Sequence, residues 1–315
     1  MPHSEYPFDE VTFCNIGNPQ AFRQKPISFN RQVLACLLDT SLLKNSNINP
    51  DVAKRAQRIL NDAVSIGSYT HSMGLPVVRE SVARFIEKED QVPRPNINEI
   101  FLTEGASQGV HLLIQSLISS EKDAIMIPIP QYPLYSASIT LNGGTAAPYY
   151  LDESKGWQLD IKELERSYEE QQKAGKTVRA ICIINPGNPT GAIFSLETIQ
   201  AILEFAVRKR ILVISDEVYR TNIYKEGARF ISARAALEKM APEFRNSCEL
   251  ASLHSVSKGL TGECGLRGGY VYLHNFNPKV TEQFLKLKSI CLCSNTIGQS
   301  MVELLVNPPL EGVAA

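Results

Sequence analysis

Apolar and polar positions along the chain follow two patterns. Residues 30–43, 50–65 and 76–89 carry apolar side chains at the spacing of a helix face, and Pro76 suits the first turn of the third helix. From residue 100 onward, short apolar runs alternate with longer stretches of helical spacing. The runs that predict strands are 100–103, 124–128, 145–150, 179–184, 211–215, 249–255 and 269–273, and the predicted helices among them are 107–119, 132–141, 161–173 and 195–208.

Strands that alternate with helices are typical of an α/β fold with a mostly parallel sheet covered by helices. In such sheets, ligands bind in the crevice at the carboxyl ends of the strands. The residues that directly follow each predicted strand are therefore the candidates for binding and chemistry.

Composition narrows the function classes without naming one. The 315 residues carry 32 Lys and Arg against 33 Asp and Glu, so no positive excess favours nucleic acid as a partner. No apolar run approaches the roughly 20 residues of a membrane span, and the acidic start MPHSEYPFDE resembles neither a signal nor a transit peptide. Seven cysteines, an odd number, predict no disulfide framework. We expect a cytoplasmic protein without a metal site, in which Cys291 and Cys293 are helix or core residues.

Two of the predicted strands are followed by groups suited to bind an anion. After the first strand, Gly105 permits a tight turn, and the free N–H groups around Ala106, Ser107 and Gln108 would cradle an anion at a helix start. The alternative is a plain N-cap by Ser107. After residue 184 comes Asn185-Pro186-Gly187-Asn188-Pro189-Thr190-Gly191, where Asn188 would hold an anionic oxygen or belong to an ordinary multi-turn loop.

Two further strand ends carry charged groups. Asp216, in Asp216-Glu217-Val218-Tyr219, is either solvated or buried, and a buried carboxylate needs a cation to stay ionised. Lys258, in Ser255-Val256-Ser257-Lys258-Gly259, is either a loop lysine or a buried amine suited to forming a Schiff base. Ser255 and Ser257, together with Arg267, would suit the binding of a phosphate group. The nearby glycines follow the wrong strand for a dinucleotide fingerprint.

Taken together, the four strand ends fit one ligand, pyridoxal phosphate. Its phosphate would bind to the N–H groups at the helix start, to the two serines and to Arg267. Its protonated ring nitrogen would pair with Asp216. Its phenolate oxygen would take Asn188 and Tyr219, and its aldehyde would take Lys258.

The chain resembles the class I and II aminotransferases of pyridoxal-phosphate fold type I. The family patterns stand here as residues 185–191, 216–219 and 255–259, although the arginine follows the lysine by nine residues where relatives usually have eight. Residues 262–265 and 127–136 are similar to the branch of the family that transaminates alanine. The likeness extends from about Pro7 to Pro309.

The resemblance implies a three-layer α/β/α large domain and a role for each candidate. Lys258 would bind the cofactor and move the proton, Asp216 would keep the ring an electron sink, and Tyr219 and Asn188 would hold the phenolate side. Tyr132 would stack on the ring, Ala106, Ser107 and Gln108 would contact the phosphate, and Gly17 and Asn188 would face the substrate. Tyr69 would reach the phosphate of a neighbouring subunit, which implies a homodimer. Without the resemblance, Tyr69 could be a packed aromatic residue and Gly17 a simple turn residue.

The implied reaction is amino transfer between L-alanine and 2-oxoglutarate, which gives pyruvate and L-glutamate. Family members close a small C-terminal domain that carries a carboxylate-binding arginine, and no arginine follows Arg267. We therefore expect residues 1–50 to form an N-terminal arm that contributes to the small domain and residues 51–315 to form the large domain. We also expect the rest of the small domain to be absent and transamination to be impaired. Alternatives are a glutamate–glyoxylate aminotransferase, a C–S lyase or decarboxylase on the same fold, and a non-catalytic cofactor-binding or dimerising protein.

Overall fold

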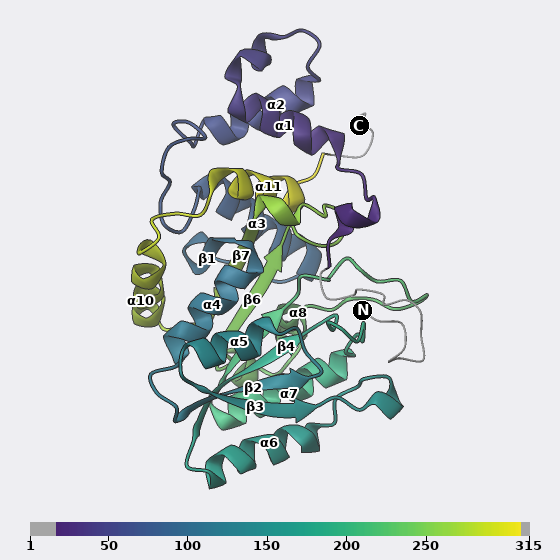
Figure 1. Ribbon diagram of the computed structural model, residues 1–315, viewed down its shortest axis with the longest axis vertical. Coiled ribbons are helices and arrows are strands. Elements are labelled where there is room, and N and C mark those ends of the chain that lie inside the picture. The colour runs from purple at the N-terminus through teal and green to yellow at the C-terminus, as the bar shows by residue number, and fades with distance from the viewer. Residues whose placement is uncertain (1–16, 310–315) are drawn as a thin grey trace, which may run out of the picture.

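The structure is a computed structural model that describes residues 17–309, and these form a seven-stranded sheet (Figure 1). The strand order is β1-β7-β6-β5-β4-β2-β3, with β7 antiparallel to both of its neighbours and the other pairs parallel. The predicted α/β fold with a mostly parallel sheet is therefore confirmed. The strands are β1 Ile100–Glu104, β2 Asp123–Ile129, β3 Thr145–Tyr150, β4 Thr177–Ile184, β5 Leu212–Asp216, β6 Leu250–Ser255 and β7 Gly268–His274.

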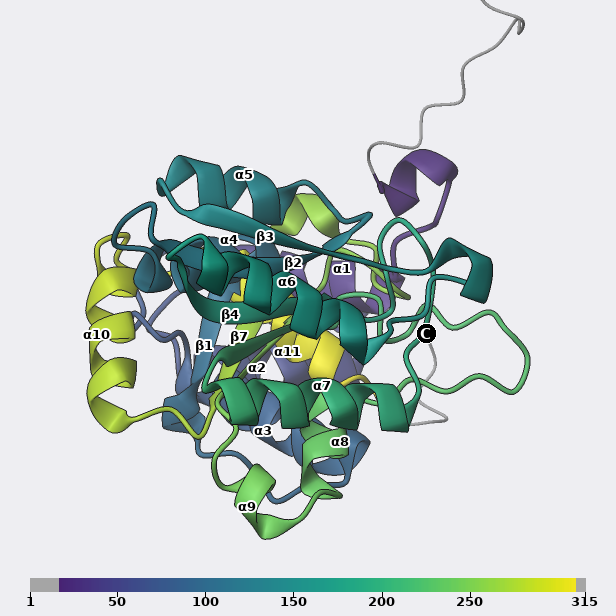
Figure 2. The ribbon, with the colours of Figure 1, turned by 90° about the horizontal axis from the view of Figure 1, so that it is seen from below.

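Helices cover both faces of this sheet. Successive strand residues point to opposite faces, so Ile125 and Ile127 enter one hydrophobic core and Met126 enters another. The first face packs against α4 Gly105–Leu117, α5 Leu134–Leu141 and α10 Pro278–Ser289. The opposite face packs against α6 Ile161–Lys173, α7 Leu196–Lys209 and α8 Ala233–Glu238, and the short α9 Pro242–Arg245 follows α8. Figure 2 shows α5 on one side of the sheet and α7 on the other, which gives the three layers that the resemblance implied.

Four further helices extend the second layer at one end of the molecule, at the top of Figure 1. They are α1 Ser28–Leu38, α2 Pro50–Leu60, α3 Pro76–Asp90 and α11 Thr296–Val306, and their apolar faces share a core with Leu102 and Tyr270 of the sheet. Because α1 packs with α2 in this core, residues 28–38 are anchored to the rest of the described chain. The division into an arm and a large domain stays a prediction, and residues 1–16, with Cys14, and 310–315 lie outside the described range.

The element boundaries differ from the predictions in two instructive places. The helix predicted to start at residue 107 begins at Gly105, and its N-cap is Glu104, which makes no side-chain capping bond. Ser107 is thus inside the helix, and its suggested role as N-cap is wrong. The helix predicted over 30–43 ends at Leu38, after which a 3-10 turn, Thr40–Lys44, begins with Asp39 as its cap.

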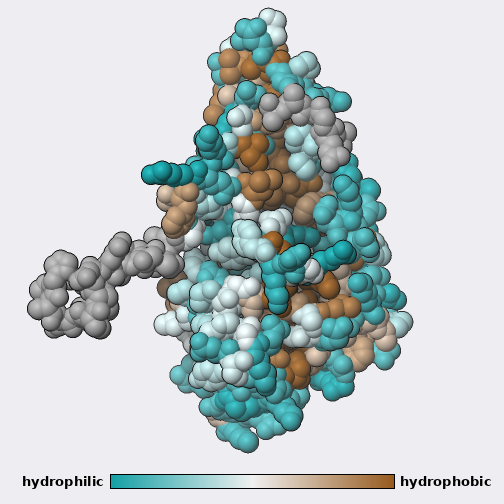
Figure 3. All heavy atoms as spheres, turned by 90° about the vertical axis from the view of Figure 1, so that its right-hand side faces the viewer, coloured by the Kyte–Doolittle hydropathy of each residue, from teal (hydrophilic) through white to brown (hydrophobic). Residues whose placement is uncertain are grey.

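The surface mixes hydrophilic and hydrophobic residues, and Figure 3 shows a group of hydrophobic residues in the upper half of one face. Within residues 17–309, no helix combines the length and apolar character needed to cross a bilayer. Over the same residues, no three His, Cys, Asp or Glu side chains are grouped so that they could hold a metal ion.

Candidate active site

The candidate residues meet at one edge of the sheet because β1, β4, β5 and β6 all run in the same direction. Asp216 pairs in register with Ile184 on one side and with Leu253 on the other. Gly268, at the start of the antiparallel β7, lies beside Glu104 at the end of β1. The loops that follow these strands therefore open on a common edge, as the sequence predicted.

Asp216 is buried at the end of β5, with 5% of its surface exposed. Its carboxylate accepts a hydrogen bond from the Tyr135 hydroxyl at 2.7 Å and another from the Val218 backbone N–H at 3.3 Å. Burial raises the pKa of Asp216, whereas the hydrogen bond from Tyr135 and the charge of Lys258 lower it. Within the described residues, no cation lies within ion-pair distance of this carboxylate. Such a site would accept a cation from a ligand.

Lys258 lies in the loop after β6 and points toward the same edge. Its Nζ donates a hydrogen bond to the Gly17 carbonyl at 2.6 Å and lies 5.7 Å from the centre of the Tyr219 ring. Burial lowers the pKa of Lys258, the charge of Arg267 lowers it further, and Cys264 and Asp216 act in the opposite direction. A lowered pKa increases the fraction of neutral amine, the form that reacts with carbonyl groups.

Arg267 lies against the first turn of α4. Its guanidinium donates to the Ser107 hydroxyl at 2.8 Å and to the Glu104 and Cys264 carbonyls at 3.1 and 3.0 Å. Gly105 has φ +71°, a conformation that favours glycine, and a Cβ there would lie 2.6 Å from Arg267 Nη2, so glycine leaves room for the guanidinium in its present position. The charge of Arg267 has no carboxylate partner among residues 17–309.

The remaining candidates lie around these three charges. Asn188 Nδ2 is 3.5 Å from the Tyr219 hydroxyl, which brings the two predicted phenolate donors together. Ser255 and Ser257 are both buried, and the Ser255 hydroxyl accepts the Ser257 N–H at 3.3 Å. Ala106 is also buried at the start of α4, and Tyr132 is 43% exposed.

Of the side chains predicted to contact a phosphate, Gln108 is bonded within its own helix and Tyr69 is exposed to solvent in the isolated chain. The Gln108 side chain turns back within its own helix and accepts the Glu104 N–H at 2.9 Å. Tyr69 is 80% exposed, so it is not the packed aromatic residue that was its alternative explanation. An aromatic side chain this exposed is available to a second molecule, although the contact itself stays a prediction.

Pyridoxal phosphate fits the chemistry of these residues. It carries an anionic phosphate, a cationic ring nitrogen and an aldehyde, which match Arg267, Asp216 and Lys258 respectively. In the described chain, each of these three groups has hydrogen bonds but no ion-pair partner, and the hydrogen bonds of Arg267 to Ser107 and Glu104 hold it beside the helix N-terminus. The donor set therefore leaves a place for each charge of the cofactor.

Two side chains around the motif at 216–219 have partners that only the fold brings close. Tyr135 lies in the similar stretch 127–136, yet its hydroxyl contacts Asp216, 81 residues later. Arg220 follows the motif at 216–219 directly, and its side chain is buried on the opposite face, 2.7 Å from Asp90 and 3.9 Å from Glu217. Two signals for these contacts were available in the sequence. Tyr135 stands at the start of an apolar helix, and Arg220 closely follows the acidic residues Asp216 and Glu217.

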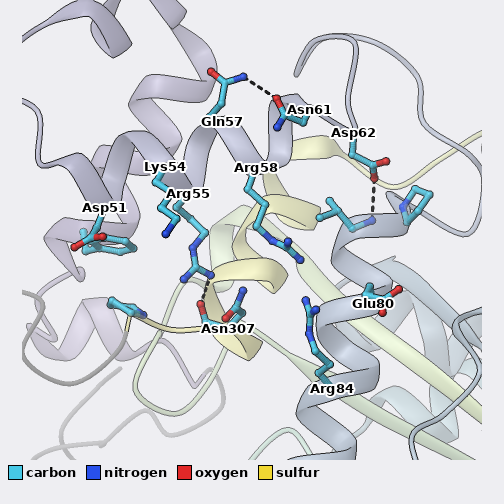
Figure 4. Close-up of a pocket in the computed structure, with 14 residues that line it drawn as sticks. Asp51, Lys54, Arg55, Gln57, Arg58, Asn61, Asp62, Glu80, Arg84 and Asn307 are labelled. Carbon is cyan, nitrogen blue, oxygen red and sulfur yellow. Dashed lines mark hydrogen bonds between the residues drawn. The ribbon is translucent and has the colours of Figure 1, made fainter.

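A cleft of about 1110 Å³ lies elsewhere, between α2, α3 and the end of α11 (Figure 4). Arg55, Arg58 and Arg84 line it, and Arg55 and Arg58 both pair with the buried Glu303. None of its lining residues belongs to the strand-end site. Lys54 and the three arginines of the lining stand against Asp51, Asp62, Glu80 and the buried Glu303, so the cleft has no positive excess that would favour an anion.

The chain belongs to the class I and II aminotransferases, since the model of that family matches residues 39–313. This family depends on pyridoxal phosphate. The assignment agrees with the motifs and with the matching charges at the strand edge.

Within the family, the chain is similar to alanine aminotransferases. It is 46% identical to alanine aminotransferase 1, mitochondrial, from Arabidopsis thaliana, over 98% of this chain and 57% of that protein. It is 44% identical to human alanine aminotransferase 1, over 96% and 62% respectively. It is also 44% identical to glutamate–glyoxylate aminotransferase 1 from Arabidopsis thaliana, over 96% and 64%. The chain thus spans about three fifths of the length of these relatives.

Solved structures support the same fold. An alanine aminotransferase from Pyrococcus furiosus matches with a TM-score of 0.70 at 24% identity, over 95% of this chain and 74% of that one. A tyrosine aminotransferase from Leishmania infantum matches with a TM-score of 0.73 at 22% identity, over 93% and 65%.

Proposed function

We propose that this chain provides the pyridoxal-phosphate site of an aminotransferase that moves the amino group between L-alanine and 2-oxoglutarate, giving pyruvate and L-glutamate. The observation that supports it is the meeting of Asp216, Lys258 and Arg267 at one sheet edge, where none of the three has an ion-pair partner among residues 17–309. The similarity to alanine aminotransferases over nearly the whole chain favours alanine as the amino donor.

The geometry supports part of the proposed roles, and the resemblance to the family supplies the others. Arg267, Ser107 and the N–H groups of the first turn of α4 would hold the phosphate, assisted by Ser255 and Ser257, with Ala106 and Gln108 in the same turn. Asp216 would pair with the ring nitrogen, Tyr219 and Asn188 would donate to the phenolate oxygen, and Tyr132 would cover a ring face. The bound cofactor supplies an electron sink for a Cα carbanion.

Lys258 would carry the proton in this reaction. Its pKa is lowered by burial, so a larger share of the amine is neutral and able to accept the Cα proton at near-neutral pH. Gly17, whose carbonyl already binds the amine, would lie beside the substrate together with Asn188. Asp216, ionised by the pairing, would keep the ring nitrogen protonated while Lys258 holds the proton.

The test begins with cofactor binding by the full chain. We expect one pyridoxal phosphate per chain by absorbance, and borohydride reduction should fix it to Lys258, as located by peptide mass spectrometry. Lys258→Ala should lose this covalent capture and all turnover while still binding cofactor non-covalently. Capture at another lysine, or near-wild-type transamination by Lys258→Ala, would contradict the assignment.

Product assays separate the candidate reactions. The proposal expects pyruvate and glutamate from L-alanine and 2-oxoglutarate. Glycine formed faster from glutamate and glyoxylate would favour the second candidate, which the 44% identity to a glutamate–glyoxylate aminotransferase supports. Ammonia release from a cysteine conjugate would indicate a C–S lyase. Cofactor binding with no product from any pair would favour a non-catalytic protein.

We also propose that the chain acts as a homodimer in which Tyr69 of one subunit approaches the cofactor phosphate of the other. The 80% exposure of Tyr69 supports this, as do the exposed Val64 and Leu260. Light scattering should give twice the chain mass, and Tyr69→Phe should weaken phosphate binding without changing that mass. We keep a cytoplasmic location as the proposal and a mitochondrial one as its alternative, which organelle fractionation distinguishes.

A further inference from the structure

Two segments far apart in sequence lie side by side next to Lys258. The first, residues 17–31, is called here the N-terminal strap, and the second, residues 256–264, the lysine loop. Gln24 Nε2 donates to the Leu260 carbonyl at 2.7 Å, and Gln20 Nε2 donates to the Gly262 carbonyl at 3.1 Å. These amide-to-carbonyl bonds fasten the strap along the lysine loop over more than 230 residues of sequence separation.

Glu263 is the charged centre of this contact. It is 2% exposed, and its carboxylate accepts from Arg31 Nε at 2.8 Å, from Arg31 Nη2 at 2.9 Å and from Gln20 Nε2 at 2.9 Å. Arg31 is the only cation within ion-pair distance of Glu263 in the described chain. Since a buried carboxylate that loses its partner is strongly destabilised, this bidentate pair couples the strap to the loop.

The other end of the strap lies on the Lys258 amine. The Gly17 carbonyl accepts from Lys258 Nζ at 2.6 Å, and a Cβ at residue 17 would lie only 2.7 Å from that nitrogen. Asn18 continues the contact, since its side-chain oxygen lies 3.7 Å from Cys264 Sγ. Any displacement of the strap therefore changes the surroundings of the amine directly.

We propose that Glu263 is a positioning residue that orients the Lys258 amine through the strap. By binding Arg31 and Gln20, it fixes the strap, and the fixed strap holds the Gly17 carbonyl against the amine. Glu263 itself does not touch the amine. The catalytic meaning of this arrangement rests on the proposed function, whereas the mechanical coupling does not.

The experiment uses the full chain without cofactor. Hydrogen exchange of peptides covering residues 18–31 reports the strap, and the rate of acetylation of Lys258 by acetic anhydride, read by mass spectrometry, reports the amine. We expect Glu263→Gln to speed both by roughly tenfold or more, because a charge-assisted bidentate pair is lost. Arg31→Gln should have a similar effect, and Arg31→Lys a smaller one.

A double variant and a matched control make the test specific. Glu263→Gln with Arg31→Gln should behave like either single variant, because both remove the same interaction. Glu87→Gln breaks an exposed pair with Arg94 elsewhere and should change neither rate. Unchanged exchange and acetylation in Glu263→Gln, or effects that add in the double variant, would overturn the proposal. If Glu263→Gln does not fold, the exposed Arg31 variants carry the test by the same criteria.

Added pyridoxal phosphate separates this proposal from the proposed function. If the wild type takes no cofactor at Lys258 but the Glu263 and Arg31 variants release the strap, the proposed function fails and the coupling stands. If the wild type takes cofactor while the variants leave the strap and the amine unchanged, the coupling fails and the proposed function stands.

Discussion

Asp216 and Glu217 are adjacent buried carboxylates at the end of β5 that have opposite surroundings. Strand alternation sends Asp216 toward the face of α5, where it contacts the Tyr135 hydroxyl and a backbone N–H. Glu217 points to the other face, where it accepts from the Ser215 hydroxyl and the Ala233 N–H, with Arg220 3.9 Å away. Burial raises the pKa of both groups.

The difference between them is a cation supplied by the chain. Arg220 lies 2.7 Å from Asp90 and within about 5 Å of the ring centres of Phe85 and Phe230, so the carboxylates on that face have a cation from within the protein. On the face of Asp216, the described chain offers no such partner. A buried charged side chain that has no partner of opposite charge in the protein indicates a binding site for a charged ligand. A buried charged side chain that has such a partner indicates a structural role.

The largest effect should come from removing the matching cation. Arg220→Met leaves Asp90 and Glu217 buried without it, and breaking a buried pair in this way costs about 3–5 kcal/mol. Urea denaturation should show this loss in the free energy of unfolding. Arg94→Met, which breaks an exposed pair with Glu87, should cost no more than about 1 kcal/mol. A small loss in Arg220→Met would remove the contrast between the two faces.

Asp216→Asn should weaken the binding of pyridoxal phosphate without lowering the stability of the chain. Because its pKa is raised in the folded chain, ionisation of Asp216 opposes folding, and stability falls as pH rises through the raised pKa. At pH 8, the cofactor-free variant should therefore be as stable as wild type or slightly more so. Its affinity for pyridoxal phosphate should fall roughly tenfold to a hundredfold, since a charge-assisted bond is lost. A strong destabilisation without loss of affinity would make Asp216 a structural residue.

The pH dependence of stability that His254 causes tests the face of the sheet that carries Arg220. It is buried among Phe85, Tyr270 and Arg220, and burial, aided by the charge of Arg220, lowers its pKa to about 3. Below pH ~6.5 the unfolded chain gains a proton that the folded chain cannot take, so stability is lost as pH falls. Between pH 7.5 and 5, wild type should lose about 2 kcal/mol more than His254→Phe. Equal losses would mean that His254 is protonated in the folded chain.

The sequence predicted the sheet, its edge and the charged residues there because those features are local. A short apolar run that ends in Asp216, or a loop that carries Lys258, is contained in a few consecutive positions. The conformation of Gly105 is also local, since the turn between a strand and a helix calls for it.

The sequence did not predict the partners that fix those groups, because they come from distant elements. Tyr135 reaches Asp216 across 81 residues, Asp90 reaches Arg220 across 130, and Gly17 reaches Lys258 across 241. Each pairing depends on how helices and loops pack on the sheet, which apolar periodicity alone does not specify. Glu263 was recognised only within a stretch similar to one branch of the family, while its contact with Arg31 required the fold.

Tyr135→Phe should give the smallest effect, and it bears on the unmatched face itself. The variant loses one hydrogen bond to Asp216, which costs about 1 kcal/mol of stability. Because that bond lowers the pKa of Asp216, its loss should raise this pKa further. Asp216 pairs with a cationic ring only when ionised, so cofactor affinity in Tyr135→Phe should decline at a higher pH than in wild type as the solution is acidified. Tyr149→Phe is the matched control, because its buried hydroxyl donates to the Cys182 carbonyl, and it should lose similar stability without that shift. The same shift in both variants would show that the Tyr135 hydroxyl does not tune Asp216.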